Sequence, residues 1–234
     1  MAINSTDDSL AARFAALQKE RERSWSAKDL AENFAQRQAL VDDFDPRATV
    51  KPGDIVPAFE LDETRGGTLF SEELVANGPA VLIFVRFADC PADNIALPYY
   101  DRALSAPLRA AAVPLVAISP QPPERLDAIR VRHGLDLTVA TDRDNRLARA
   151  LGLTFRPLST PEPPPPGWIG EKAGTDSWEL PQTAVIILDP GHRVRFVAIS
   201  PDWLDRVEPD EVLVALSPLR AQAIKRRDRH SALS

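Results

Sequence analysis

Short apolar runs alternate with helical patterns through most of the chain, and this alternation constrains the fold more than any other feature. "VLIFVRF" (81–87) and "VPLVAIS" (113–119) are rich in β-formers without polar alternation, as expected of strands buried on both faces. The segment between them predicts a helix with Pro91 in its first turn and a kink near Pro98. Together these segments predict a βαβ unit with parallel strands.

The elements that follow extend this unit into a mixed sheet. A helix that closes on Gly134, a short strand over 137–141 and a helix that ends at Gly152 come next. "TAVIILD" and "RVRFVAIS" are separated only by "PGH", which predicts a hairpin of two strands. A last helix is expected from about residue 208. This order predicts an α/β fold, with a mixed central sheet flanked by helices on both faces.

Two further helices are expected ahead of this region, in a helical extension over residues 1–49. "STDDS" suits a helix N-cap, and apolar residues then recur at helical spacing. They are Leu10, Phe14, Leu17, Leu30, Phe34, Val41 and Phe44. Their apolar stripes are narrow, so the helices could pack on the main domain or on a second subunit in a homodimer. The proline-rich segment 45–61 marks the boundary near residue 50.

A second proline-rich segment interrupts the main domain between residues 155 and 182. It contains "RPLSTPEPPPPGWIG" and has no convincing periodicity. Consecutive prolines favour a stiff extended linker, whereas a loop of this length in a compact domain is more often a functional cover. Trp168 and Trp178 favour packing against the body of the domain. We therefore divide the chain into the extension, a main domain over 50–222 with this insertion, and a basic tail over 223–234.

Composition argues against several classes of function. The net charge of −6 disfavours binding to nucleic acid, and the one basic cluster, "KRRDRH", is typical of a solvated helix end. Three scattered histidines offer no metal-ligand spacing, and we expect neither metal nor cofactor. No apolar run is long enough for a membrane span. A single cysteine excludes an intramolecular disulfide, and no signal-peptide core is present, so we expect a cytoplasmic protein.

Cys90, the single cysteine, lies where the first buried strand gives way to a helix. The unpaired N–H groups and dipole of a helix N-terminus favour a thiolate, which is the nucleophilic form of cysteine. Arg86 and Arg195 are cations that could reach the same pocket, whereas carboxylates at Asp89 and Asp93 oppose ionisation. From the residues alone, a redox nucleophile and a small buried apolar residue are equal alternatives.

Several motifs resemble one family when taken in order. They are "KPGDIVPAFELDE", "VLIFVR" leading to "CP", "LVAISPQPPERL", "DNRLARALGL", "DSWELP" and "VIILDPGHRVRF". Over residues 50–216 the chain resembles the peroxiredoxin-like branch of the thioredoxin superfamily, of the alkyl hydroperoxide reductase and thiol-specific antioxidant type. The resemblance implies a thioredoxin-like fold and a thiol peroxidase. In such an enzyme a thiolate attacks a peroxide, becomes sulfenic acid and is restored by another thiol.

The resemblance also implies roles for particular residues. Cys90 matches the peroxidatic cysteine and Arg86 the arginine that stabilises thiolate and peroxide. The second cysteine of the motif falls on Asp93, so an external thiol, thioredoxin or a glutathione-like compound, would have to resolve the sulfenic acid. Phe87 replaces the usual Thr or Ser. Thr183 takes the place of the cis-proline that faces the cysteine, where its hydroxyl could donate to a thiolate or peroxide oxygen.

Two other functions remain open at this point. The chain could be a redox-silent thioredoxin-fold module that binds a partner through its proline-rich loop or N-terminal helices, which Phe87 and Asp93 favour. It could also be a one-cysteine thiol-disulfide exchanger, which would form a stable mixed disulfide with glutathione but react little with peroxide.

Overall fold

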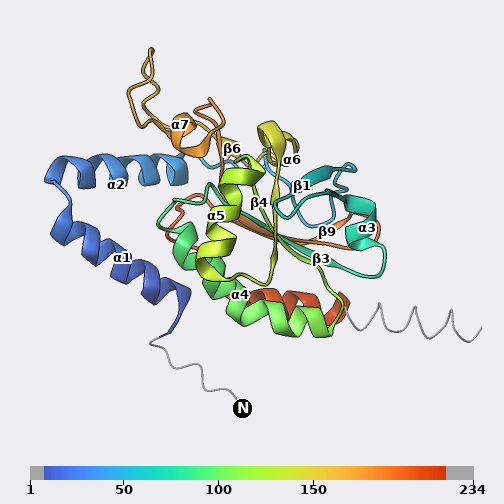
Figure 1. Ribbon diagram of the computed structural model, residues 1–234. Helices are drawn as coiled ribbons and strands as arrows, with labels where there is room; N and C mark the ends of the chain where they lie inside the picture. Colours follow the sequence, from blue (N-terminus) through green and yellow to red (C-terminus); the bar gives the residue numbers. More distant parts are fainter. Residues whose placement is uncertain (1–7, 220–234) are drawn as a thin grey trace, which may run out of the picture.

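The computed structural model describes residues 8–219, and a seven-stranded mixed sheet lies at its centre (Figure 1). Its order is β2-β1-β5-β4-β3-β8-β9. The strands are β1 Glu60–Glu63, β2 Thr68–Phe70, β3 Ala80–Phe84, β4 Leu115–Ser119, β5 Thr138–Thr141, β8 Thr183–Leu188 and β9 Val194–Ser200. β3, β4 and β5 are parallel, while the β8–β9 hairpin pairs antiparallel with β3. The predicted α/β fold and its edge hairpin are therefore confirmed.

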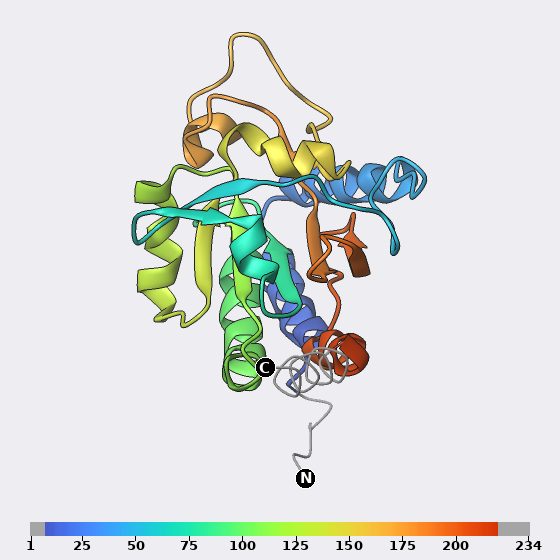
Figure 2. The same ribbon diagram turned by 90° about the vertical axis from the view of Figure 1, so that its right-hand side faces the viewer.

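Helices cover both faces of this sheet. They are α1 Leu10–Ser24, α2 Ala27–Asp42, α3 Ser71–Val75, α4 Asp93–Ala110, α5 Pro123–His133, α6 Arg146–Ala150 and α7 Ile169–Ala173, with a 3-10 turn at Arg143–Asn145. Residues 209–219 form a last helix, which lies at the same end of the molecule as the lower part of α4 (Figures 1 and 2). The phenolic hydroxyl of Tyr100 on α4 donates to the Val207 carbonyl at 2.6 Å and so ties α4 to the segment that leads into this helix.

The central strands separate two hydrophobic cores. Along β3, Val81 and Ile83 point into the core that contains α1, α4 and α5. Leu82 and Phe84 point into the second core, with α3 and α6. This division follows from the alternation of side chains along a strand. It explains why β3 needs an unbroken apolar run.

The N-terminal hairpin α1–α2 packs on its own domain, which answers a question that the sequence left open. Leu10 is fully buried, and its backbone N–H donates to the Glu208 carboxylate at 3.2 Å. On α2, Arg37 binds the Asp202 carboxylate through two nitrogens, at 2.7 and 2.6 Å. Ser9 caps α1 by accepting from the Ala12 N–H at 3.0 Å. The two predicted helices are therefore confirmed, while the homodimer stays a prediction.

Two predicted boundaries near Cys90 are wrong by a few residues. β3 ends at Phe84 rather than at residue 87, and α4 begins at Asp93 rather than at Pro91. The cause is a change of hydrogen-bond partner, because the backbone N–H groups of Arg86 and Phe87 donate to the Asp93 carboxylate, at 2.9 and 3.4 Å. Arg86 and Phe87 therefore leave the sheet, although the largely apolar run in which they lie favours a strand.

The β1–β2 hairpin was not predicted from the sequence. Both strands are short, and between them Gly66 and Gly67 adopt φ of 101° and 93°. Glycine is the residue that reaches this backbone region without strain. β1 pairs antiparallel with β5 and so extends the parallel part of the sheet at its second edge.

The insertion 155–182 has more structure than its composition suggested. β6 Thr154–Phe155 pairs with β7 Leu180–Pro181, and α7 lies between them. Trp178 is buried and its ring centroid lies 4.7 Å from that of Trp168. Trp178 therefore packs as predicted, but the part of the insertion before α7 extends away from the body (Figures 1 and 2). Its role as a cover stays a prediction.

Other predictions fall partly or wholly outside the described residues. The basic tail 223–234 lies there, so the structure does not describe it. Within residues 8–219, no helix combines the length and the apolar character needed to cross a membrane. The cytoplasmic location stays a prediction.

Replacing Phe14 tests whether α1 belongs to the folding unit. Phe14 is 2% exposed in the core, whereas Phe34 on α2 is 63% exposed. Phe14→Ala should lower the free energy of unfolding by about 3 kcal/mol, since it leaves a cavity. Phe34→Ala should change it by less than about 0.5 kcal/mol. Denaturant unfolding measures both, and equal effects would show that α1 does not contribute to the core.

Candidate functional site

Cys90 lies in the turn between β3 and α4, and its side chain is fully buried. Its backbone N–H donates to the Phe87 carbonyl at 3.0 Å, while its carbonyl accepts from the Asn94 N–H at 3.0 Å. The second bond places Cys90 at the start of the first turn of α4. Arg86 approaches the sulfur directly, because its Nη2 donates to Cys90 Sγ at 2.8 Å. The structure therefore brings together two of the residues that the sequence singled out, Cys90 and Arg86.

Asp93 organises the loop around this thiol. Its carboxylate has no exposure. One oxygen accepts the backbone N–H groups of Arg86 and Phe87, and the other accepts from Arg206 Nη2 at 2.7 Å. The Arg206 side chain is 3% exposed. Although burial raises the pKa of Asp93, Arg206, Arg86 and the backbone donors hold it below its usual range. Asp93 is therefore a buried carboxylate anchored by an arginine from the far end of the chain.

Trp203 holds the Arg86 guanidinium in place. The guanidinium carbon lies 4.3 Å from the centroid of the indole ring, a cation-π geometry that favours a fixed orientation. The Trp203 carbonyl in turn accepts from Arg206 Nε at 3.0 Å. The segment after β9 thus positions both arginines of the thiol site.

Burial decides the ionisation of Cys90 in this conformation. It raises the pKa of the thiol, and the charge of Asp93 adds to the effect. Arg86, Arg206 and the backbone N–H of Asp93 act in the opposite direction but do not cancel burial. The closed site therefore holds a thiol at neutral pH, and the nearby cations would favour the thiolate once water reaches the sulfur.

Two electrostatic expectations from the sequence need correction. Asp89 is not among the charges that oppose ionisation of Cys90, because its side chain is 68% exposed and pairs with Arg132 at 2.9 Å. Arg195 is not in the pocket, because it lies on β9 and pairs with Asp189 at 2.7 Å. Arg206 supplies the second guanidinium instead. The sequence signal for it was weak, since "DWLDR" shows only a Trp and an Arg among acidic residues.

Thr183 lies at the start of β8, opposite Ser200 in the hairpin register, and is 2% exposed. Its hydroxyl donates to the Ser200 carbonyl at 3.3 Å. A hydroxyl has one proton to donate, so donation to Cys90 or to a peroxide would require this bond to break. The role of Thr183 facing Cys90 stays a prediction.

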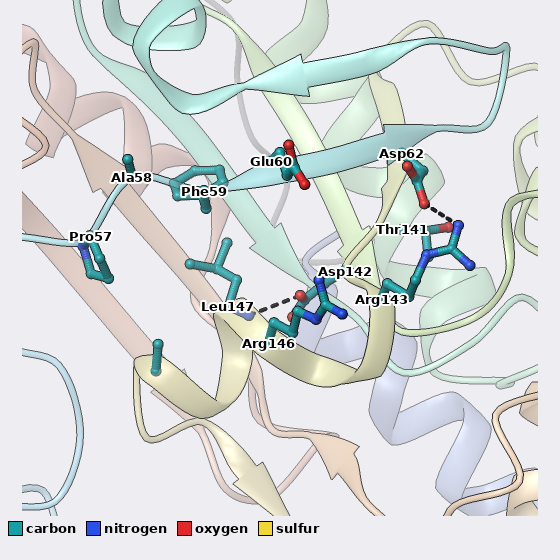
Figure 3. A pocket seen from close by; sticks show the side chains of 11 residues that line it. Pro57, Ala58, Phe59, Glu60, Asp62, Thr141, Asp142, Arg143, Arg146 and Leu147 are labelled. Atoms are coloured by element: carbon teal, nitrogen blue, oxygen red, sulfur yellow. Dashed lines mark hydrogen bonds and ion pairs between the residues drawn. The ribbon is translucent and has the colours of Figure 1, made fainter.

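A separate cavity of about 240 Å³ opens at the end of β5, and Cys90 does not line it (Figure 3). The Asp142 carboxylate is buried there and accepts the backbone N–H groups of Leu147 and Ala148, both at 2.9 Å. Arg143 pairs with Asp62 across the cavity. Because these polar groups are engaged in holding α6 and β1, we assign the cavity no part in the chemistry of Cys90.

Comparison with known proteins identifies the family. The model of the AhpC/TSA family matches residues 52–197, which is more than half of the chain and includes Cys90 and Arg86. The chain belongs to the AhpC/TSA family. No curated protein matches it. The family region excludes α1 and the 203–206 segment, so Trp203 and Arg206 come from outside it.

Solved structures of peroxiredoxins share the fold. Peroxidoxin BcpB from Mycobacterium tuberculosis has a TM-score of 0.56 and 21% identity, over 74% of this chain and 97% of that one. A mutant of peroxiredoxin 6 from Arenicola marina gives 0.56 and 20%, over 72% and 73%. The bacterioferritin comigratory protein from Xanthomonas campestris gives 0.52 and 14%, over 70% and 92%. These similarities support the thioredoxin-like fold.

Replacing Asp93 tests its role as the anchor of the thiol loop. Asp93→Asn should lower the free energy of unfolding by about 3–5 kcal/mol, because it leaves the Arg206 charge buried and unpaired. Asp89→Asn, at the exposed ion pair, should cost less than about 1 kcal/mol. Denaturant unfolding at neutral pH measures both.

The difference in stability between wild type and Asp93→Asn should also depend on pH. Since the folded pKa of Asp93 is lowered, its stabilisation is present above the unfolded pKa, about 4, and is lost as the pH falls through the folded value. The stability difference between wild type and Asp93→Asn should therefore shrink in acid. A difference that stayed constant from neutral pH to strong acid would argue against an ionised Asp93.

Proposed function

We propose that the protein is a thiol peroxidase that reduces hydrogen peroxide or organic hydroperoxides through Cys90 alone. The observation that carries this proposal is the 2.8 Å contact between Arg86 Nη2 and Cys90 Sγ. A guanidinium donor at this position stabilises negative charge on the sulfur before reaction and on the peroxide oxygens during it. Membership of the AhpC/TSA family supports the same chemistry.

The proposed reaction has three steps. The Cys90 thiolate attacks one peroxide oxygen, forming an S–O bond while the O–O bond breaks, and the alkoxide or hydroxide that leaves takes a proton. The sulfur is oxidised to sulfenic acid. One external thiol then displaces water and forms a mixed disulfide with Cys90. A second thiol reduces this disulfide and restores the Cys90 thiol, so two thiols become one disulfide in each cycle.

The external thiol follows from the composition of the chain. Cys90 is its only cysteine, and the carboxylate of Asp93 stands where the motif has a second one. A carboxylate cannot form a disulfide. We therefore propose a thioredoxin-like or glutathione-like reductant as the partner of the oxidised enzyme.

Burial of the sulfur adds a requirement for access. Cys90 has no solvent exposure, so a peroxide can reach it only after the surrounding segments move. Hydration on opening would remove the largest cause of the raised pKa, while Arg86 would remain beside the sulfur. Reaction would then proceed from an opened state that is rich in thiolate.

The same burial also favours the second candidate, a redox-silent module. If the site never opens, the thiol stays protonated and inert, as buried structural cysteines are. The one-cysteine exchanger differs from both, because its sulfur would form a mixed disulfide with glutathione but react little with peroxide.

Trapping the sulfenic acid separates these functions. Brief exposure to stoichiometric hydrogen peroxide with a sulfenic-acid trap should give one adduct at Cys90, detected by intact mass, and none in Cys90→Ser. Glutathione disulfide in a parallel sample tests the exchanger. No adduct from either reagent within seconds would identify the redox-silent module.

Replacing Arg86 tests the electrostatic part of the mechanism. Arg86→Gln should reduce the second-order rate constant for peroxide by about 100-fold, since it removes the donor that stabilises the developing charge. Arg195→Gln, at an ion pair on β9, is the matched control and should leave the rate unchanged. The loss of free Cys90 thiol with time in quenched samples measures the rate constant in the same way for wild type and both variants. Equal rates in Arg86→Gln and wild type would contradict the mechanism.

A further inference from the structure

Trp203 and Arg206, which hold the thiol site from the side of β9, lie in a segment without regular structure. This segment, residues 201–208, joins β9 to the last helix and belongs to no strand or helix. A turn within it is closed by the Asp205 N–H, which donates to the Asp202 carbonyl at 2.9 Å. Loops are more mobile than the elements that they connect. Contacts with other elements must therefore fix the places of Trp203 and Arg206.

A bidentate ion pair joins α2 to the 201–208 segment. Nε and Nη2 of Arg37 donate to the two carboxylate oxygens of Asp202, at 2.7 and 2.6 Å, and the two side chains are 16% and 23% exposed. A guanidinium bound in this way fixes orientation as well as distance. One oxygen of Asp202 also accepts the Leu204 N–H at 2.9 Å. The pair thereby holds the chain on both sides of Trp203.

The charges of this pair compensate each other. Although burial raises the pKa of Asp202, Arg37 and the Leu204 N–H hold it below its usual range, so the carboxylate is ionised at neutral pH. Arg37 is fixed from α1 as well, because its Nη1 donates to the Gln18 amide oxygen at 3.2 Å. One guanidinium therefore joins α1, α2 and the 201–208 segment.

α1 makes two further contacts with the same segment. The Phe14 ring centroid lies 5.5 Å from the guanidinium carbon of Arg206, within the range of a cation-π interaction. The Glu208 carboxylate accepts the backbone N–H groups of Leu10 and Ala11, at 3.2 and 3.0 Å. These N–H groups lie in the first turn of α1, where they have no partner within the helix. The hairpin α1–α2 thus holds the segment at several points along its length.

A short series of contacts leads from this hairpin to the sulfur. Arg37 binds Asp202, which is the chain neighbour of Trp203. The guanidinium carbon of Arg86 lies 4.3 Å from the centroid of the Trp203 ring, and Arg86 Nη2 donates to Cys90 Sγ at 2.8 Å. Apart from one peptide bond, every step is a direct contact. A shift of the 201–208 segment would therefore change how Arg86 meets the thiol.

We propose that Arg37 is a positioning residue of the Cys90 site. Through it the N-terminal hairpin α1–α2 keeps Trp203 stacked on Arg86, and so keeps the Arg86 guanidinium against the sulfur. The inference deepens the proposed function and rests on it, because its consequence is the reactivity of Cys90. Arg37 acts through the geometry of the 201–208 segment, since Asp202 compensates its charge. The hairpin lies outside the region that matches the family, and it is then a working part of the thiol site.

The pH dependence of Cys90 alkylation by iodoacetamide tests this role without any peroxide. Its midpoint reports the pKa of the thiol in the state that reacts. Arg37→Met should raise the midpoint by about 0.5 unit, so that about threefold less thiolate is present below it, because Arg86 is no longer held against the sulfur. Asp202→Asn releases the same segment and should also raise the midpoint. An effect of charge alone would move the two variants in opposite directions and would overturn the proposal.

Arg130→Met is the matched control for loss of a half-buried ion pair. On α5, Nε and Nη2 of Arg130 donate to the two oxygens of Asp127 at 2.6 and 2.9 Å, and the side chains are 23% and 27% exposed. This variant should keep the wild-type midpoint, and thermal unfolding measures how much stability each Met variant loses. A midpoint that shifts as much in Arg130→Met as in Arg37→Met would reject a specific role for Arg37.

A cycle of double variants shows whether Arg37 acts through Arg86. Arg37→Met should shift the midpoint in the wild-type background and leave it unchanged in the Arg86→Gln background, since the two effects share one guanidinium. Equal shifts in both backgrounds would contradict this, as would an unchanged midpoint in a folded Arg37→Met variant.

Two further outcomes are distinguishable. If Arg37→Met does not fold, Arg37→Lys takes its place, because lysine keeps the charge but lacks the planar fork that binds both carboxylate oxygens, and it should raise the midpoint in the same way. If the shifts are coupled but wild type forms no sulfenic acid with peroxide, the peroxidase is rejected and the role of Arg37 is retained. If sulfenic acid forms and the shifts are not coupled, the peroxidase stands and the role of Arg37 is rejected.

Discussion

The thiol site depends on the buried ion pair between Asp93 and Arg206. A buried ion pair alone is weak grounds for stability, because desolvation offsets most of the attraction. Here the same carboxylate also accepts two backbone N–H groups at the end of β3. It thereby joins the sheet, the first turn of α4 and the segment after β9. At the position where the family motif has a second cysteine, this chain has Asp93, whose carboxylate holds the loop in place.

Neutralising Asp93 has a consequence for the sulfur. The carboxylate of Asp93 opposes the ionisation of Cys90, and Arg206, which is paired with it, offsets part of this effect. Arg86 then remains available to the sulfur, with its guanidinium fixed on Trp203. The largest obstacle to ionisation of Cys90 is the burial of its sulfur, which access of water would remove. Reactivity at this site is therefore a question of access more than of charge.

The parts of the fold that were predictable are those with both faces buried. β3, β4 and β8 are buried along their whole length and need continuous apolar runs, which are visible in a single sequence. β9 is only partly buried, and the short turn that joins it to β8 predicted it. β1 and β2 were missed because strands of four and three residues are too short to carry such a signal. The end of β3 was misplaced because Val85 and Phe87 are as apolar as the strand before them. What ends the strand is the Asp93 carboxylate, which no local propensity reports.

Residues of the site that are close in the sequence could be predicted, whereas those that are far apart could not. Arg86 and Cys90 are four residues apart, and the short turn between β3 and α4 that contains both brings them together. Arg206 is 113 residues from Asp93, and its approach follows from the path of the chain after β9. The sequence instead suggested Arg195 as the second cation near Cys90, because Arg195 lies in a recognisable strand. Arg206 lies outside the region that matches the family. Family membership therefore accounts for the scaffold and the thiol, whereas one of the charges that act on the thiol comes from the segment after β9.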